Sequence, residues 1–327
     1  MPTITECLDL FLSGIKDART ENTYRHHVSA AKNFKQSLLD NDLDPNKTPI
    51  ELLTEEHISK FITGLKKRSK GTEQVYITDM KKFYLFLGDE NVRQFNYPRI
   101  VRLIKFRKRK PPVRLPQFPE DDIKEFLEHI DDIINPEHPF EKDSEKLRAY
   151  RDRAFIITIA DTGMRVSEIC GLIIGSVDRR KGITIILGKN NEEAVVRFTK
   201  RSLKAIREYL DLRYQHDMKF GTQRASLPVF IRHDQGASRR NVAPMSTSNA
   251  RSMIMKVRIP EILKRRPEIK ISPHSFRHFF VTQIYKKTKD VLLAKGLARH
   301  KNIETTKIYT HLDDDDLDKG YHDVFGE

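Results

Sequence analysis

The chain has 327 residues, and 60 Lys and Arg against 46 Asp and Glu give it a formal net charge of +14. This length suits two domains of ordinary size, and the basic charge favours a nucleic acid partner, with a merely solvated basic surface as the alternative. Cys7 and Cys170 stand in unrelated contexts, which argues against a disulfide framework and against a Cys-based zinc site.

Residues 1–92 show helical spacing of apolar residues and no strand pattern, so a compact helical domain is expected there. The helices are predicted over residues 3–18, 20–39, 54–65 and 71–87, the third with Thr54 as N-cap. The first of them has early acidic residues and no basic n-region, which favours a helix over a signal peptide. No apolar run approaches the roughly 18 residues that span a bilayer, and an intracellular protein is expected.

Residues 93–118 carry nine basic residues and no acidic one. Pro111, Pro112 and Pro116, with Pro119 just beyond, interrupt any helix. We expect an extended basic linker that lies on phosphates, with a solvated run of charge as the alternative.

From Glu120 onward the pattern is mostly helical. Helices are predicted over residues 120–134, 147–161, 200–217, 246–258, 274–287, 290–297 and 303–311, with an acidic surface insertion at 135–146. The β-branched runs 182–188 and 193–199 flank GKNNEE and predict a β-hairpin with Lys189 at its tip. The fold class is therefore mainly α with a small antiparallel β-sheet.

Six residues scattered over this second half suit chemistry on an oxyanion. They are Arg165 in DTGMRVSEI, Lys189 in LGKNNEE, His274 and Arg277 in PHSFRH, His300 in LARHKN, and Tyr309 in ETTKIYTH. Two guanidiniums, an ammonium and two imidazoles suit the transition state of a phosphodiester, whose charge is spread over several oxygens. The set resembles the tyrosine recombinases of the phage-integrase, Xer-like family, over about residues 118–312, and fills all six positions of the family motif.

The resemblance assigns Tyr309 as the nucleophile, with His300 opposite it across the phosphate. A phenol has a pKa of about 10 and needs cations nearby to attack as phenolate. A tyrosine that only packs on a helix is the alternative. No metal is expected, because the pair His300 and His311 lacks a supporting carboxylate or cysteine.

Arg165 and Arg277 would clamp the non-bridging oxygens, since the planar guanidinium donates two parallel hydrogen bonds and stays charged. Gly163 precedes Arg165 by two positions, so a tight turn is expected to present Arg165 at a helix start. Glu168 lies one helical turn further on and is expected to pair with Arg165 and orient the cluster.

Lys189 would protonate the departing 5′ oxygen, although Lys181, Lys200 and Lys204 remain open for that role. His274 and Arg277 share one face of a helix whose first turn contains Pro273. His274 could accept the Tyr309 proton or donate to the phosphate, and His278 is expected to pack beneath the site.

No cofactor is expected. The protein's cations would stabilise the phosphorane-like transition state without a metal, and a covalent 3′-phosphotyrosine would keep the energy of the phosphodiester bond. The sequence has no Gly-Lys-Ser/Thr phosphate loop, which agrees with this expectation.

Several residues outside this cluster are candidates for contact with duplex DNA, which the resemblance places between the two domains in a clamp. They are Arg25, Lys32, Lys70, Tyr76, Arg107, Lys108, Arg109, Lys110, Arg239, Arg240 and Arg251. Sequence alone does not separate base contacts from phosphate contacts.

The expected organisation is a helical core-type DNA-binding domain at 1–92, a basic linker at 93–118, a catalytic domain at 119–312 and a tail at 313–327. The tail holds four successive aspartates and would dock on a neighbouring protomer, or else fold on its own domain or fray. The resemblance implies a site-specific DNA recombinase or integrase that forms a tetramer on two duplexes, in the cytoplasm of a prokaryotic cell or with its mobile element or virus.

Two other functions stay open. A type IB topoisomerase-like enzyme would use nearly the same residues as a monomer, and a catalytically silent DNA-binding protein would keep only the fold. The short catalytic domain and the tail disfavour the first, and the complete motif disfavours the second. One departure from the family pattern is Arg299, which stands before His300 where the family usually has Gly.

Overall fold

The computed structural model describes residues 1–109, 119–134, 140–187, 193–218, 223–233, 242–257 and 271–299. The chain divides into two compact units, Met1–Pro116 and Gln117–Glu327. The division falls inside the segment predicted as a linker. No helix in the described ranges is long and apolar enough to cross a membrane.

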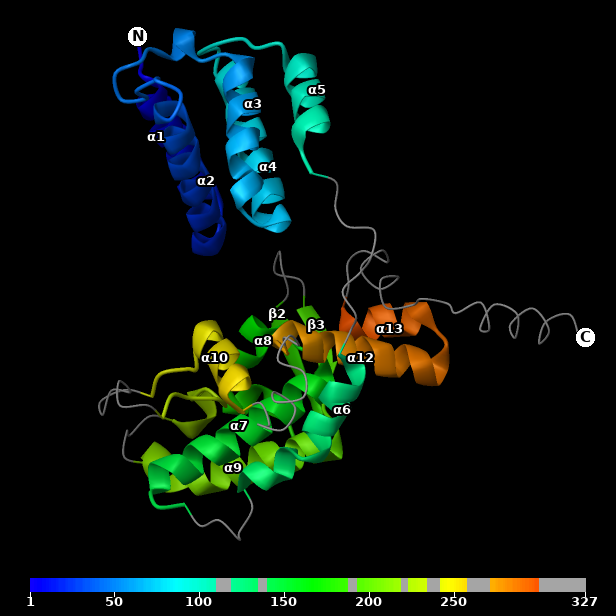
Figure 1. Cartoon of the computed structure of the whole chain (residues 1–327). Helices are drawn as coiled ribbons and strands as arrows, with labels where there is room; N and C mark the ends of the chain where they lie inside the picture. The colour runs from blue at the N-terminus through cyan, green and yellow to red at the C-terminus, as the bar shows by residue number, and fades with distance from the viewer. Residues whose placement is uncertain are drawn as a thin grey trace, which may run out of the picture. The chain divides into compact units, whose positions relative to one another are not determined.

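Unit 1 is a helical bundle, coloured blue to cyan in Figure 1, with short 3₁₀ turns at Ile50–Leu52 and Leu65–Lys67 between its α-helices. They are α1 (Ile4–Ala18), α2 (Glu21–Leu39), α3 (Glu55–Gly64), α4 (Lys70–Asp89) and α5 (Tyr97–Arg107). The first four are the predicted helices, and Thr54 is the N-cap of α3. Their apolar faces form one core in which Phe34 meets Phe61 edge to face, with ring centroids 5.3 Å apart.

The prediction of an extended linker from residue 93 was wrong for residues 97–107, which form α5. The Asn96 side chain caps this helix by accepting from the Arg99 amide at 3.0 Å, and a proline occupies its first turn. Ile100 and Ile104, one turn apart, are buried in the unit 1 core, and α5 packs on α3. The basic residues occupy the exposed side, so the segment is an amphipathic helix of the first unit. Pro111, Pro112 and Pro116 lie outside the described residues.

Unit 2 is helical around one long central helix. The helices in its described residues are α6 (Glu120–Glu128), α7 (Asp143–Thr162), α8 (Val166–Cys170), α9 (Lys200–Met218), α10 (Thr247–Val257), α12 (Pro273–Thr288) and α13 (Val291–Ala298). Short 3₁₀ turns cover Ile130–Ile134, Ile174–Ser176 and Arg224–Ser226. The helix expected over 303–311 lies outside the described residues.

The predicted surface insertion at 135–146 was too long, because α7 already begins at Asp143. Asp143 and Glu145 stand in its first turn, where carboxylates stabilise the exposed amides of a helix start. Residues 135–139 lie outside the described part.

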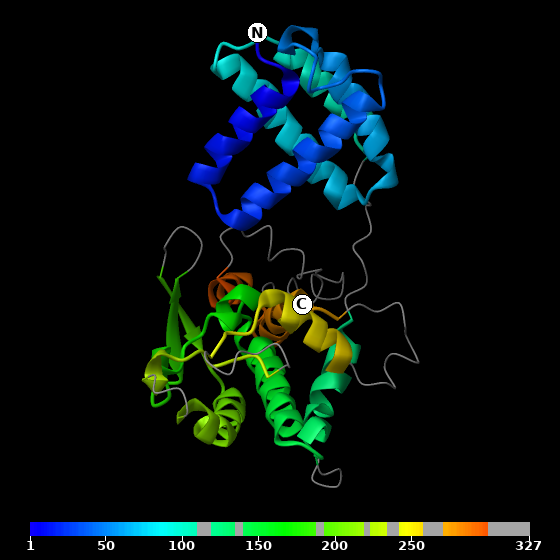
Figure 2. The same cartoon turned by 90° about the vertical axis from the view of Figure 1, so that its left-hand side faces the viewer.

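A three-stranded antiparallel sheet stands at one side of unit 2 (Figure 2). Its strands are β1 (Val177–Asp178), β2 (Ile183–Leu187) and β3 (Glu193–Arg197), in the order β1-β2-β3. The predicted hairpin is present, with Ile185 opposite Val195 and Leu187 opposite Glu193. Its tip, with Lys189, lies outside the described residues.

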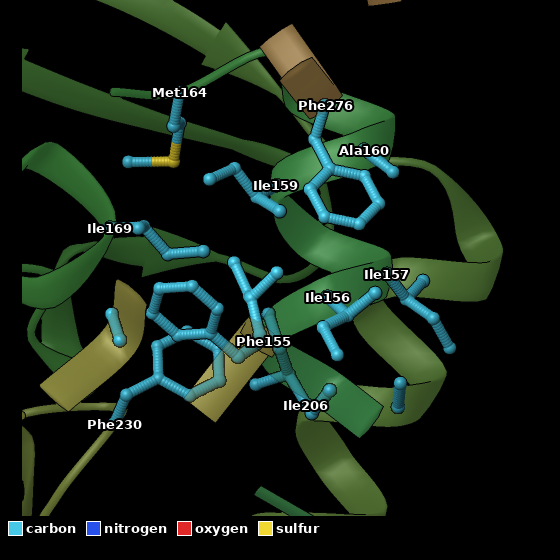
Figure 3. Packing of buried hydrophobic residues seen from close by; sticks show 14 of the residues in the cluster. Phe155, Ile156, Ile157, Ile159, Ala160, Met164, Ile169, Ile206, Phe230 and Phe276 are labelled. Atoms are coloured by element: carbon cyan, nitrogen blue, oxygen red, sulfur yellow. The ribbon is translucent and has the colours of Figure 1, made fainter. Parts of the chain in front are cut away.

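Helix α7 forms the centre of the unit 2 core. Figure 3 shows Phe155, Ile156 and Ile159 of this helix among buried residues of the surrounding elements. Phe276 of α12 is fully buried beside Ile159 and Ala160 (Figure 3). This contact fixes the start of α12, from which His274 and Arg277 project, against the end of α7, where the Arg165 turn begins.

Candidate active site

The turn between α7 and α8 positions Arg165. Gly163 ends α7 in the left-handed region, with φ 59° and ψ 22°, and Arg165 is the N-cap of α8. A Cβ on Gly163 would lie only 2.4 Å from Cδ1 of Phe280. Glycine is therefore required both for its backbone conformation and for the close approach of α12. The Arg165 side chain remains 46% exposed, accessible to a ligand.

Glu168 holds Arg165 from the first turn of α8. Its Oε2 accepts the Arg165 backbone N–H at 2.8 Å, and its Oε1 accepts from Nη1 of the same arginine at 2.7 Å. Burial would raise the pKa of Glu168, but these hydrogen bonds and the charge of Arg299 hold that pKa below its ordinary value. The structure thus contains the predicted Arg165–Glu168 ion pair, with the carboxylate charged at neutral pH.

Arg277 links three segments. It is only 4% exposed, and its two terminal nitrogens donate to the carbonyl oxygens of Gly163 and Ala298. One guanidinium on α12 is therefore joined to the turn that carries Arg165 and to the end of α13. The next described residue after Ala298 is Arg299, and His300 would follow it.

His274 lies one helical turn before Arg277, behind the Ser272 cap, and Pro273 is in the first turn as predicted. His274 is exposed to solvent on one side. Partial burial lowers the pKa of its imidazole, and the charges of Arg277 and Arg165 lower that pKa further. Both arginines therefore disfavour the protonated form of His274. The His278 ring meets the His274 ring edge to face at 4.2 Å between centroids.

Arg299 joins this cluster through contacts that its sequence context did not predict. Its terminal nitrogen Nη2 lies 3.3 Å from the Gly163 carbonyl oxygen and 3.4 Å from Oε2 of Glu168. The signal that could have identified it was its presence at a position where the resemblance leads one to expect glycine.

The remaining motif residues lie outside the described part of the chain. These are Lys189, His300 and Tyr309. The structure brings Arg165, Glu168, His274 and Arg277 together, and its described part stops at Arg299, directly before His300. Among the described residues, no group of three or more His, Cys, Asp and Glu side chains could hold a metal ion.

Ten of the eleven proposed DNA contacts fall into three groups, and Arg109 stands apart. Arg25, Lys32, Lys70, Arg107, Lys108 and Arg251 are exposed. Tyr76 is half-buried, with its hydroxyl 2.7 Å from Oγ of Ser29. Lys110, Arg239 and Arg240 lie outside the described residues.

Arg109 is engaged within unit 1. Its Nε donates to the buried carboxylate of Glu73, and its Nη2 donates to the Arg68 carbonyl oxygen at 2.7 Å. The Arg109 backbone N–H also reaches Glu73, at 2.9 Å. These contacts give Arg109 a structural role that its place in a basic run did not reveal.

Unit 1 also has an open polar groove of about 720 Å³ along α2 and α3. Four basic residues line it, namely Lys60, Lys67, Arg68 and Arg107, together with the acidic Asp40 and Glu56. Basic residues outnumber acidic ones along this groove, so it suits contact with an anionic polymer.

Comparison with known proteins gives consistent results. The family model described as Phage integrase family matches residues 117–316. A tyrosine recombinase XerC of Thermodesulfovibrio yellowstonii is 27% identical over 309 residues, covering 93% of this chain and 90% of that protein. The XerC of Pelobacter propionicus is 30% identical over 272 residues, covering 83% and 77%. The crystal structure of the XerH site-specific recombinase bound to palindromic difH substrate superposes with a TM-score of 0.65 at 18% identity, covering 99% of this chain and 85% of that chain, and so shares the fold.

Proposed function

Because the chain belongs to the phage integrase family, we propose that it cuts and rejoins DNA at specific sites through a tyrosine of the unit 2 cluster. The chain is a Xer-like tyrosine recombinase and a DNA-processing enzyme. Its substrate is double-stranded DNA, and it would act in the cytoplasm of a prokaryotic cell. The observation that carries the site assignment is the convergence of Arg165, His274 and Arg277 around the Gly163 turn.

The two arginines are suited to charge stabilisation in different ways. Arg165 is half-exposed and oriented by Glu168, so it can meet one non-bridging oxygen of the scissile phosphate. Arg277 is buried and fixed by two carbonyl oxygens, so its guanidinium is already oriented before DNA binds. A donor that needs no reorganisation stabilises developing charge more effectively than a mobile one.

In the proposed reaction, the Tyr309 oxygen forms a bond to phosphorus while the bond from phosphorus to the 5′ oxygen breaks. The neutral His274 would accept the phenol proton, and Lys189 would give a proton to the departing 5′ oxygen. His300 would donate to the phosphate from the other side. In the second step, a 5′-hydroxyl of a partner duplex would attack the phosphotyrosine and release Tyr309.

A recombinase and a topoisomerase-like enzyme differ in the product they make. The target site is first found by covalent capture from nicked duplexes of randomised sequence. A supercoiled plasmid with two copies of this site then distinguishes the two enzymes. A recombinase yields two circles or an inverted segment, whereas relaxation without exchange would support the topoisomerase-like alternative. Binding with neither product would support a silent DNA-binding protein.

The proposed assembly is a tetramer on two duplexes, because both strands of each duplex must be cut, which makes four cleavages, and each protomer supplies one tyrosine. The tail at 313–327, which lies outside the described residues, is proposed to join neighbouring protomers. Arg25, Lys32, Lys70, Arg107 and Lys108 are proposed as phosphate contacts of unit 1.

A further inference from the structure

Arg299 occupies a backbone conformation that favours glycine. It is the C-cap of α13, with φ 59° and ψ 43°. A side chain with a Cβ is strained in this region, and a strained residue at a site is a reason to examine what its side chain does. Here the side chain is only 10% exposed, so it is directed into the protein and away from solvent.

The guanidinium of Arg299 spans from α13 to the Arg165 turn. It donates to the carbonyl oxygens of Leu297 at 3.1 Å and Gly163 at 3.3 Å, and it pairs with Oε2 of Glu168 at 3.4 Å. The Gly163 carbonyl is the same oxygen that Arg277 contacts. Arg299 is the last described residue before His300, and its side chain contacts the same acceptors that orient Arg165 and Arg277.

Glu168 is shared between two arginines. Its Oε1 faces Nη1 of Arg165, while Oε2 faces Arg299 and the Arg165 backbone amide. The carboxylate is 8% exposed, so little water screens it. Without a second cation, the Glu168 carboxylate would pair with Arg165 alone and would compete with a phosphate for the Arg165 guanidinium.

We propose that Arg299 is a positioning residue of the recombinase site, which shares the charge of Glu168 so that Arg165 can turn to the scissile phosphate, and which fixes the backbone before His300. The inference rests on the proposed function. Arg299 is not assigned a contact with DNA, because its burial keeps it behind Arg165.

The test compares single-turnover cleavage of a nicked duplex by the full chain and by Arg299→Gln and Arg299→Lys. Both variants keep a Cβ and so keep the strained backbone, but only the lysine keeps the charge. We expect Arg299→Gln to slow cleavage at least about tenfold with less than about threefold change in DNA affinity. Arg299→Lys should retain more of the rate than Arg299→Gln.

A second change separates charge sharing from a merely structural role. If Arg299 balances Glu168, then adding Glu168→Gln to Arg299→Gln removes the unbalanced charge, and the double variant should cleave faster than Arg299→Gln alone. Additive losses in this cycle would overturn the proposal. A wild-type cleavage rate in Arg299→Gln would overturn the proposal as well. So would an Arg299→Lys variant that cleaves no faster than Arg299→Gln.

Two outcomes of the same assay keep this inference distinct from the proposed function. If the wild-type chain forms no covalent adduct, the proposed function itself fails. If it does, and Arg299→Gln cleaves equally fast, only the inference fails. Should Arg299→Gln not fold, Arg299→Gly, whose backbone suits this φ, takes its place with the same expected loss and the same contradicting result.

Discussion

Nη1 of Arg165 lies 2.7 Å from Oε1 of Glu168, and the backbone N–H of the same arginine donates to Oε2 at 2.8 Å. This double contact orients an otherwise half-exposed guanidinium at the start of α8. It makes the Gly163 turn an element on which the proposed chemistry depends.

Gly163→Ala should therefore impair both stability and cleavage. Left-handed backbone costs a residue with a Cβ about 1–2 kcal/mol, and the new methyl would overlap Phe280 at 2.4 Å. Chemical denaturation and single-turnover cleavage measure the two effects. Gly182→Ala is the matched control, because Gly182 has φ +66° but its nearest neighbour would lie 3.5 Å away. Equal losses in the two variants would show that the Phe280 contact is unimportant.

Arg165→Ala and Arg277→Ala should both lose about 10²–10³ in cleavage rate, the usual effect of removing a donor to a transition state. They should differ in stability. Arg277→Ala leaves the buried Gly163 and Ala298 carbonyls without this donor, at a cost of about 1–3 kcal/mol, whereas Arg165 is 46% exposed. Equal losses of rate and DNA affinity for Arg165→Ala would mean that Arg165 only positions DNA.

The pH dependence of His274 follows from its surroundings. Its pKa lies below the ordinary 6.5, through burial and the charges of Arg277 and Arg165, so it gains a proton only as the pH falls below that value. An unfolded chain takes up this proton near pH 6.5, so the stability that neutral His274 contributes is present above that pH and declines below it. NMR titration of the imidazole signals should show a midpoint below 6.5.

His129 provides an internal control in the same titration. A hydrogen bond to the Glu125 carbonyl and nearby acidic residues raise its pKa above 6.5. The two histidines should therefore titrate on opposite sides of that value in the DNA-free protein. A His274 midpoint at or above that of His129 would argue against its role as proton acceptor.

The basic segment that ends α5 should contribute unequally to DNA binding. Arg107 is exposed, so Arg107→Gln should lower the slope of log K against log salt by about 0.9. Arg109→Gln should change that slope less and reduce the thermal stability of unit 1, because it leaves the buried Glu73 carboxylate without its guanidinium. Salt titrations of DNA binding and melting curves of Arg107→Gln and Arg109→Gln measure these two effects. A larger slope change for Arg109→Gln would show that Arg109 leaves Glu73 to bind phosphate.

The sequence predicted the helices of unit 1 up to α4, the β2–β3 hairpin and the helices α7, α9, α10, α12 and α13 of unit 2 because their apolar spacing is regular. It gave no range for the short helix α8, and the predicted helix over 120–134 ends at Glu128, followed by the 3₁₀ turn Ile130–Ile134. It failed at α5, where basic residues outnumber the two buried isoleucines, Ile100 and Ile104, that hold the helix. Charge content describes the exposed side of a segment, whereas its conformation follows from the few residues that it buries.

For the proposed site, the motif singled out Arg165, Glu168, His274 and Arg277, and the predicted Arg165–Glu168 pair is present. The motif could not identify Arg299 or Arg109 as contact residues, because their partners lie far away in the sequence. Arg299 meets Gly163 and Glu168, and Arg109 meets Glu73. Such contacts depend on tertiary packing, which no local pattern encodes.

Tyr309 is proposed to attack the DNA backbone within the cation cluster of unit 2. A nicked duplex carrying the target site tests this attack most directly, since the nick releases the short 5′ strand and traps the covalent product. Denaturing electrophoresis should show a protein–DNA adduct with the wild-type chain and none with Tyr309→Phe, while both bind the duplex equally. An adduct that persists in Tyr309→Phe would contradict the account, and so would the absence of any adduct with the wild-type chain.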